Sequence, residues 1–159
     1  QAMQAVSYYR EYYEEKGMFE NEVYPGIKQL LRDLIKQGVL CLVATSKPEI
    51  YAKKILDYYE LSNYFYYIAG ANMDGTRTDK AEVIAYALKQ IPAEYSNKKV
   101  LMVGDRSHDI IGAKKNGIDC AGVLFGYGSR EELEEAGADF VADSVEAVRN
   151  IVFLNAAKN

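Results

Sequence analysis

The chain has 159 residues, of which 49% are hydrophobic and 26% charged, so we expect one globular domain with a buried core. Its formal net charge is −4 and no run of basic residues occurs, which argues against nucleic acid as a partner. No apolar run approaches the roughly 18 residues of a membrane span, so no membrane partner is expected either.

Apolar periodicity divides the chain into alternating helices and strands. In chain order, helices are predicted at residues 2–16, 26–37, 48–59, 80–90, 109–116, 129–136 and 144–154. Strands are predicted at residues 39–44, 64–69, 100–103, 120–125 and 140–141, where the sequence has continuous apolar runs typical of strands covered on both faces. This alternation with short connections predicts an α/β fold in which helices cover both faces of a parallel sheet.

Polar side chains follow three of the predicted strands. Thr45 and Ser46 come directly after the first of them, and Lys80 ends the polar loop after the second. Asp105 and Asp109 follow the strand at residues 100–103. Because ligands in parallel α/β sheets bind outside the carboxyl ends of the strands, we expect these residues to form one site.

Each of these groups suits a phosphate or a hard cation, and each also has a structural explanation. Asp105 and Asp109 suit Mg²⁺, although an internal ion pair and helix capping would also account for them. Hydroxyls at Thr45 and Ser46 before a helix N-terminus favour an anion, and simple capping explains them about as well. Lys80 at a helix start opposes the helix dipole, which is better explained if it faces a phosphate or a carboxylate cluster. A solvated surface lysine is the structural alternative.

The remaining candidates have weaker support. The single histidine, His108, lies between the two acids in sequence, and we interpret it as an exposed neighbour of the site rather than as a base. Arg77 and Arg106 are candidates for substrate contact. Cys41 and Cys120 lie in apolar runs without metal-ligand spacing, which predicts buried free thiols in a reducing cytoplasm.

Taken in order, three segments resemble motifs II, III and IV of the haloacid dehalogenase superfamily. They are Val-Ala-Thr-Ser-Lys-Pro at residues 43–48, Lys80, and Gly-Asp-Arg-Ser-His-Asp at residues 104–109. Residues 23–26, and residues 125–129 together with 136–139, are similar to segments of its phosphoglycolate phosphatase-like and 5′-nucleotidase-like branch. The resemblance implies a Rossmann-like, three-layer α/β/α core at residues 20–159. Residues 1–19 would be the last helix of a helical cap.

The resemblance also implies a reaction, in which a Mg²⁺-assisted Asp attacks a phosphoryl group and water hydrolyses the aspartyl-phosphate. Thr45 would bind the transferring phosphoryl group, with Ser46 beside it. Lys80 would neutralise the phosphate and orient the nucleophile. Asp105 would ligate Mg²⁺, and Asp109 would hold the metal shell directly or through water. The expected substrate is a small phosphorylated metabolite, such as a nucleoside 5′-monophosphate or phosphoglycolate.

One motif of that family, an Asp-x-Asp-Gly-Thr sequence after the first strand, does not occur in its expected place. Residues 72–76 read Asn-Met-Asp-Gly-Thr, but Asn72 replaces the nucleophile and the chain order is wrong. We interpret these residues as a turn at Asp74-Gly75.

The resemblance places the strand that precedes this motif at the sheet centre, between the strands ending at Thr45 and Asp105. Without it those strands would lie roughly 10 Å apart, with unpaired backbone groups facing a gap. We therefore expect the chain to be the C-terminal portion of a longer phosphatase, inactive alone. The N-terminal segment would be absent from the sample, removed by proteolysis or supplied by another chain.

Four alternatives to a phosphatase remain. A phosphomutase of the same family would use the same groups, whereas a metal-free dehalogenase fits the Gly-Asp-x-x-x-Asp arrangement less well. A catalytically inactive binding or regulatory domain would account for the missing nucleophile. A receiver-like signalling domain, with Asp105 as phospho-acceptor, is the weakest, because the chain lacks an early acidic pair to complete its metal site.

Overall fold

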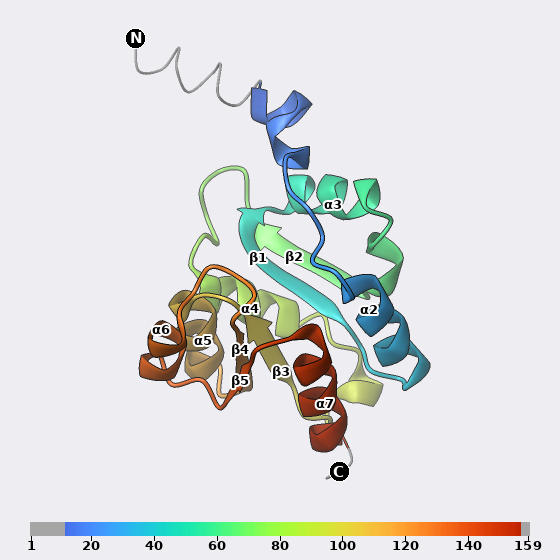
Figure 1. Ribbon diagram of the computed structural model, residues 1–159. Helices are drawn as coiled ribbons and strands as arrows, with labels where there is room; N and C mark the ends of the chain where they lie inside the picture. The colour runs from blue at the N-terminus through green and yellow to red at the C-terminus, as the bar shows by residue number, and fades with distance from the viewer. Residues whose placement is uncertain (1–11, 157–159) are drawn as a thin grey trace.

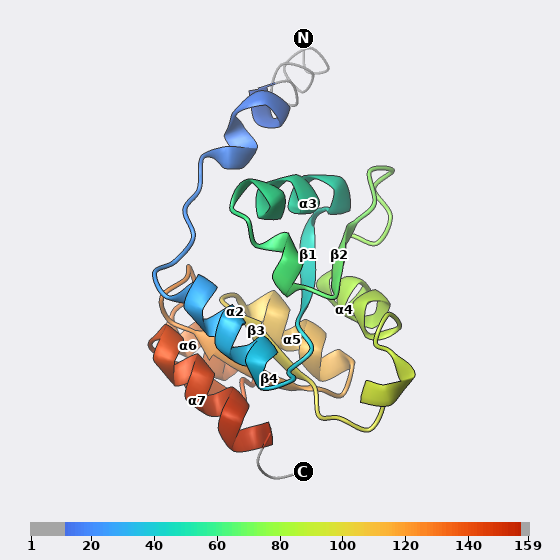
Figure 2. The ribbon, with the colours of Figure 1, turned by 90° about the vertical axis from the view of Figure 1, so that its right-hand side faces the viewer.

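The structure is a computed structural model that describes residues 12–156. Helices lie on both sides of a layer of parallel strands, with α2 and α7 on one side and α4 and α5 on the other (Figures 1 and 2). The strands are β1 (Leu42–Pro48), β2 (Tyr67–Ala71), β3 (Leu101–Gly104), β4 (Asp119–Val123) and β5 (Phe140–Ala142). The helices are α2 (Ile27–Lys36), α3 (Glu49–Tyr58), α4 (Lys80–Leu88), α5 (Ser107–Lys115), α6 (Arg130–Glu135) and α7 (Val145–Ala156). The predicted α/β class is confirmed.

The strands form two separate parallel sheets within the described residues. β1 pairs with β2, placing Val43 opposite Ile68, and β3, β4 and β5 pair in that order. No backbone ladder joins β1 to β3 in residues 12–156. The expected break between the strand before Thr45 and the strand before Asp105 is therefore present.

An open groove of about 710 Å³ separates the two sheets. Its walls include residues 38–44 on the β1 side and residues 100–103 on the β3 side, with further apolar groups from α4 and α7. Each of these strands is paired along one edge only, so its other edge carries backbone groups with no strand partner. Groups of this kind in apolar surroundings cost free energy unless a partner satisfies them.

Helices tie the two sheets together across this groove. α4 packs against β1 and β2 and also against α5, which covers β3 and β4. α2 leads into β1, yet its Leu30 and Leu34 are buried with Val123, Ala142 and Val148 of the second sheet and α7. The apolar stripe at residues 26–37 predicted this helix because leucines three and four residues apart share one helix face.

The structure corrects the predicted end of the first strand. β1 does not stop at Ala44 but continues with an irregularity to Pro48, which is the N-cap of α3 rather than part of its first turn. A residue before proline is pushed towards extended backbone, which keeps Lys47 out of a helix. Thr45 and Ser46 therefore lie in the strand and not at a helix N-terminus.

Some sequence predictions lie wholly or partly outside the described residues. Of the predicted helix at residues 2–16, the structure describes residues 12–15 as helical, followed by the 3-10 turn Gly17–Phe19. The division into a cap helix at residues 1–19 and a core at residues 20–159 stays a prediction.

Both cysteines are free; Cys120 is buried and Cys41 half-buried, and burial raises the pKa of the Cys41 thiol to about 11. Within residues 12–156, no helix is long and apolar enough to cross a bilayer.

Candidate active site

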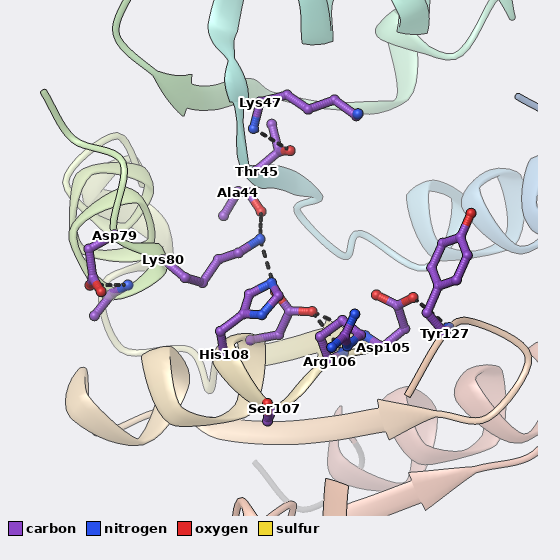
Figure 3. A network of polar contacts seen from close by, with 12 residues as sticks. Ala44, Thr45, Lys47, Asp79, Lys80, Asp105, Arg106, Ser107, His108 and Tyr127 are labelled. Carbon is purple, nitrogen blue, oxygen red and sulfur yellow. Dashed lines mark hydrogen bonds and ion pairs between the residues drawn. The ribbon is translucent and has the colours of Figure 1, made fainter. Parts of the chain in front are cut away.

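Lys80 connects the carboxyl ends of the two sheets. It is the first residue of α4, whose N-cap Asp79 accepts a hydrogen bond from the Ala81 amide at 2.9 Å. Its Nζ donates to the Ala44 carbonyl of β1 at 3.1 Å and lies 2.9 Å from Asp109 Oδ1 (Figure 3). The Lys80 side chain is only 11% exposed, so these two partners offset the cost of taking its ammonium group out of water.

Asp109 combines the two roles that the sequence left open. It is buried in the first turn of α5, where its Oδ2 accepts the amides of Asp105 at 3.1 Å and Arg106 at 3.2 Å. Its Oδ1 accepts no hydrogen bond within the described residues and faces the Lys80 ammonium. One carboxylate oxygen therefore caps the helix while the other points into the site. Gly104 permits this approach, since a Cβ there would lie 2.4 Å from the Asp109 Cβ.

Asp105 is clasped by the loop that follows β4. Its Oδ2 accepts the Tyr127 amide at 2.9 Å, and its carbonyl accepts the Gly128 amide at 2.8 Å. A Cβ at Gly126 would lie 2.3 Å from the Asp105 Cβ, and one at Gly128 would lie 2.2 Å from the Asp105 carbonyl oxygen. Two glycines are thus required for this loop to reach Asp105, which holds the carboxylate in one orientation.

Glu132 of α6 supports the Asp105–Asp109 turn, and sequence reasoning did not identify it. Its Oε1 accepts the Ser107 amide at 2.8 Å and Arg106 Nε at 3.0 Å. The Ser107 backbone hydrogen bond, followed by the Arg106 contact, lowers the pKa of Glu132 to about 2. The only sequence signal is Ser129-x-x-Glu132, which suggests a capping box within α6. Ser129 does cap that helix, but the Glu132 carboxylate binds the neighbouring turn instead.

Thr45 and Ser46 both lie in β1, and Thr45 directly follows the residue that Lys80 contacts. Thr45 follows Ala44, whose carbonyl Lys80 contacts, and its Oγ1 accepts the Lys47 amide at 3.2 Å (Figure 3). Ser46 is exposed in the last part of β1. Because neither begins a helix, the helix-dipole argument for an anion at these hydroxyls is wrong. The position of Thr45 next to Ala44, whose carbonyl accepts a hydrogen bond from Lys80, is what remains in favour of a phosphate contact.

The weaker candidates separate into two groups. His108 is 57% exposed with its Nε2 3.8 Å from Asp109 Oδ1, which makes it the exposed neighbour that we expected. Arg106 is engaged by Glu132. Arg77 donates to the Gly70 carbonyl at 2.8 Å and stacks 3.7 Å from the Tyr86 ring centroid, so it is occupied beside β2.

Residues 72–76 form the turn that we predicted. The amide and hydroxyl of Thr76 donate to Asp74 Oδ1 at 2.9 and 2.7 Å, and Gly75 has φ of +83°. The hydrogen bonds from Thr76 lower the pKa of Asp74. Asp74 is therefore committed to a local turn, which agrees with its rejection as part of the missing motif.

Asp105 and Asp109 fit part of a Mg²⁺ site. No group of three His, Cys, Asp or Glu side chains suited to a metal occurs in the described part of the chain. Each of the two aspartates nevertheless has one carboxylate oxygen without a hydrogen bond in residues 12–156, and Mg²⁺ usually takes one or two protein carboxylates with waters and phosphate oxygens. The two aspartates therefore suit a site in which Mg²⁺ also takes water and phosphate oxygens, rather than one in which protein side chains supply every ligand.

Known proteins resemble the chain over most of its length. The profile of the haloacid dehalogenase-like hydrolase family matches residues 2–123. A 5′-nucleotidase from Pseudomonas aeruginosa is 39% identical over 153 residues, and a phosphoglycolate phosphatase from Vibrio cholerae is 27% identical over 153 residues. The tyrosine-protein kinase PtkA of Mycobacterium tuberculosis is 40% identical over 140 residues. The crystal structure of a predicted phosphatase from Clostridium acetobutylicum superposes with a TM-score of 0.86 at 43% identity.

The chain is shorter than these relatives. The matches cover 95% of the chain but 67% of the 5′-nucleotidase, and 96% of the chain but 67% of the phosphoglycolate phosphatase. They cover 88% of the chain and 47% of the kinase, and 94% of the chain and 68% of the solved phosphatase. About a third to a half of each relative therefore has no counterpart in residues 1–159.

The ion pair between Lys80 and Asp109 predicts strong energetic coupling. Lys80→Met and Asp109→Asn should each lower the free energy of unfolding by about 3–5 kcal/mol, because each strands a buried charge. The double variant should lose about 1–3 kcal/mol less than the sum. Urea unfolding measures all three. The exposed pair Arg130–Glu134 is the matched control, with an expected coupling of about 0.3–0.5 kcal/mol. Equal coupling in both pairs would contradict the assignment.

The lowered pKa of Glu132 should make the free energy of unfolding decrease at acid pH. Its pKa falls from 4.5 in the unfolded chain to about 2 in the folded one, so its contribution is present above pH 4.5 and is lost as the pH falls towards 2. Glu132→Gln should flatten the dependence of stability on pH in that window. Glu131→Gln, on the same helix, is the control and should leave the dependence unchanged. Denaturant midpoints between pH 2 and 6 decide it, and identical slopes for wild type and Glu132→Gln would refute the role.

Proposed function

Because the chain belongs to the haloacid dehalogenase-like hydrolase family, we propose that it carries the phosphate-binding and metal-binding half of a phosphomonoesterase. The expected substrate is a small phosphorylated metabolite, such as a nucleoside 5′-monophosphate or phosphoglycolate. The observation that carries the proposal is the buried contact between Lys80 and Asp109, at the carboxyl ends of both sheets and next to Asp105. Charge of both signs held at one strand-end site suits a phosphate bridged to a cation.

Each side chain has a defined part in this reaction. The Lys80 ammonium attracts the phosphate and partly neutralises the phosphate charge. Asp109 and the Ala44 carbonyl hold the ammonium group in position. Thr45, which follows Ala44, would donate to a phosphate oxygen. Asp105 and Asp109 would hold Mg²⁺, which when bound supplies electrostatic stabilisation of the phosphoryl oxygens. The Tyr127 amide keeps the Asp105 carboxylate oriented towards the site.

The nucleophile belongs to a further strand in the groove between β1 and β3. Both edges that face the groove have free backbone groups, and both strands end at the site that Lys80 spans. A parallel strand in the groove would satisfy these groups and deliver its next residue beside Lys80 and Asp105. Chain outside residues 1–159 or a second molecule would supply it. The unmatched third of the 5′-nucleotidase and of the solved phosphatase supports the first source.

The reaction would then proceed in two steps. An aspartate oxygen on the added strand attacks phosphorus, and the alcohol leaves with the electron pair of the broken P–O bond and takes up a proton. Water next attacks the aspartyl-phosphate, which releases inorganic phosphate and restores the carboxylate. Lys80 acts in both steps on the charge of the phosphoryl oxygens. A phosphomutase would share the first step and differ in the acceptor.

A second candidate is phosphoryl transfer to or from tyrosine. The 40% identity to a protein named tyrosine-protein kinase PtkA favours it. The same Lys80, Asp105 and Asp109 would serve, since they act on the phosphoryl group and not on the acceptor. The fate of the phosphate separates the two candidates, because a phosphatase releases it to water. Labelled phosphate that appears on tyrosine would support the kinase alternative.

We expect the protein expressed from its complete reading frame to release phosphate from p-nitrophenyl phosphate in the presence of Mg²⁺. This release should cease when EDTA removes the metal. Lys80→Met and Asp105→Asn should each lower kcat about 10²–10³-fold, because each removes electrostatic stabilisation of the transition state. Residues 1–159 alone should be inactive. Lys53→Met, in an exposed pair, is the control and should keep full activity.

Two results would defeat the proposal. One is no Mg²⁺-dependent phosphate release from this substrate or from a panel of phosphorylated metabolites. The other is an activity of Lys80→Met equal to that of Lys53→Met. A folded, metal-binding protein without turnover would instead support the alternative of an inactive binding or regulatory domain.

A further inference from the structure

Tyr127 is a solvent-exposed ring on a fixed backbone. At 86% exposed it is the most exposed large hydrophobic residue in the described part of the chain. Its amide nevertheless donates to Asp105 Oδ2 at 2.9 Å, and the next amide, of Gly128, donates to the Asp105 carbonyl at 2.8 Å. The ring is therefore presented to water from a backbone that is attached to the proposed metal ligand.

The neighbouring glycines show that this attachment is built into the sequence. Side chains at Gly126 and Gly128 would come within 2.3 Å and 2.2 Å of Asp105 atoms, so no other residue type allows the loop this close. Both ends of the loop are also fixed: the Leu124 amide donates to the Ala142 carbonyl, and Ser129 caps α6. A loop held at both ends and at its centre keeps Tyr127 at a constant place relative to Asp105.

The other aromatic residue of the loop, Phe125, is packed against the core rather than exposed like Tyr127. Phe125 packs edge-on against Tyr24, with ring centroids 5.3 Å apart, and joins the core beneath α2. Tyr127 has no aromatic partner of this kind among the described residues. In Figure 3 its ring rises beside the Asp105 carboxylate, on the side away from Lys80. It therefore flanks the place of the phosphate without covering it.

We propose that Tyr127 is a specificity-determining residue whose ring stacks on the planar base of a nucleoside monophosphate. This inference rests on the proposed function, since it requires the phosphate to lie between Lys80 and Asp105. A tyrosine ring loses little conformational entropy on binding, and stacking of a base on an aromatic side chain contributes about 1–3 kcal/mol. A short aliphatic phosphate such as phosphoglycolate has no planar group that would gain from this ring.

Binding of AMP and of ribose 5-phosphate tests the inference, because ribose 5-phosphate carries a hydroxyl group where AMP carries its base. Titration calorimetry in EDTA, on the protein from its complete reading frame, measures binding without turnover. Wild type should bind AMP about tenfold more tightly than ribose 5-phosphate. Tyr127→Ala should remove that preference while its amide still holds Asp105. Tyr127→Phe should keep it. Tyr66→Ala, an exposed tyrosine before β2 at the opposite end of the strands, is the control.

The outcomes separate this inference from the proposed function. A base preference that is lost only in Tyr127→Ala supports the inference, even if Mg²⁺ then produces no phosphate from either ligand, which would defeat the proposed function alone. A preference that persists in Tyr127→Ala overturns the inference. So does an equal loss of affinity for both ligands, since it would mean that Tyr127 acts through Asp105, and so does a wild type without any preference.

Discussion

The buried ion pair between Lys80 and Asp109 is the interaction on which the site depends. Lys80 belongs to α4, which packs on the sheet of β1 and β2, and Asp109 belongs to α5, which packs on the sheet of β3, β4 and β5. Together with the packing of α4 on α5, the pair therefore links two sheets that no backbone ladder connects in residues 12–156. It also places a cation and a carboxylate at one point, which is what a phosphate bound with Mg²⁺ requires.

Around this pair the chain uses backbone amides to hold its carboxylates. Asp109 accepts two amides, Asp105 accepts the Tyr127 amide, and Glu132 accepts the Ser107 amide. Backbone donors are fixed by the fold, so each carboxylate has little freedom to turn away. Groups that are oriented before the substrate arrives need no reorganisation during the reaction. The same loop that orients Asp105 also places the Tyr127 ring, which would link the proposed base specificity to the proposed metal ligand.

The features that follow from spacing along the chain could be predicted from sequence. The leucine stripe predicted α2, the apolar run before Gly104 predicted β3, and the strand-end rule selected Lys80, Asp105 and Asp109. The continuation of β1 to Pro48 was missed, because the effect of proline on the preceding residue outweighed the apparent turn at Thr45 and Ser46. Glu132 and the Gly126–Gly128 clasp were missed because their contacts join residues more than 20 positions apart, and no periodicity records such contacts.

If the site works as we propose, the groove between β1 and β3 receives a strand that completes it. Amide hydrogen exchange tests it, comparing residues 1–159 alone with the protein from its complete reading frame. The amides of β1 and β3 that are not bonded to β2 or β4 should exchange rapidly in residues 1–159 and slowly in the longer protein. Those of β4, which is paired on both edges, should be protected in both. Equal protection of the β1 and β3 edges in the two proteins would contradict the claim.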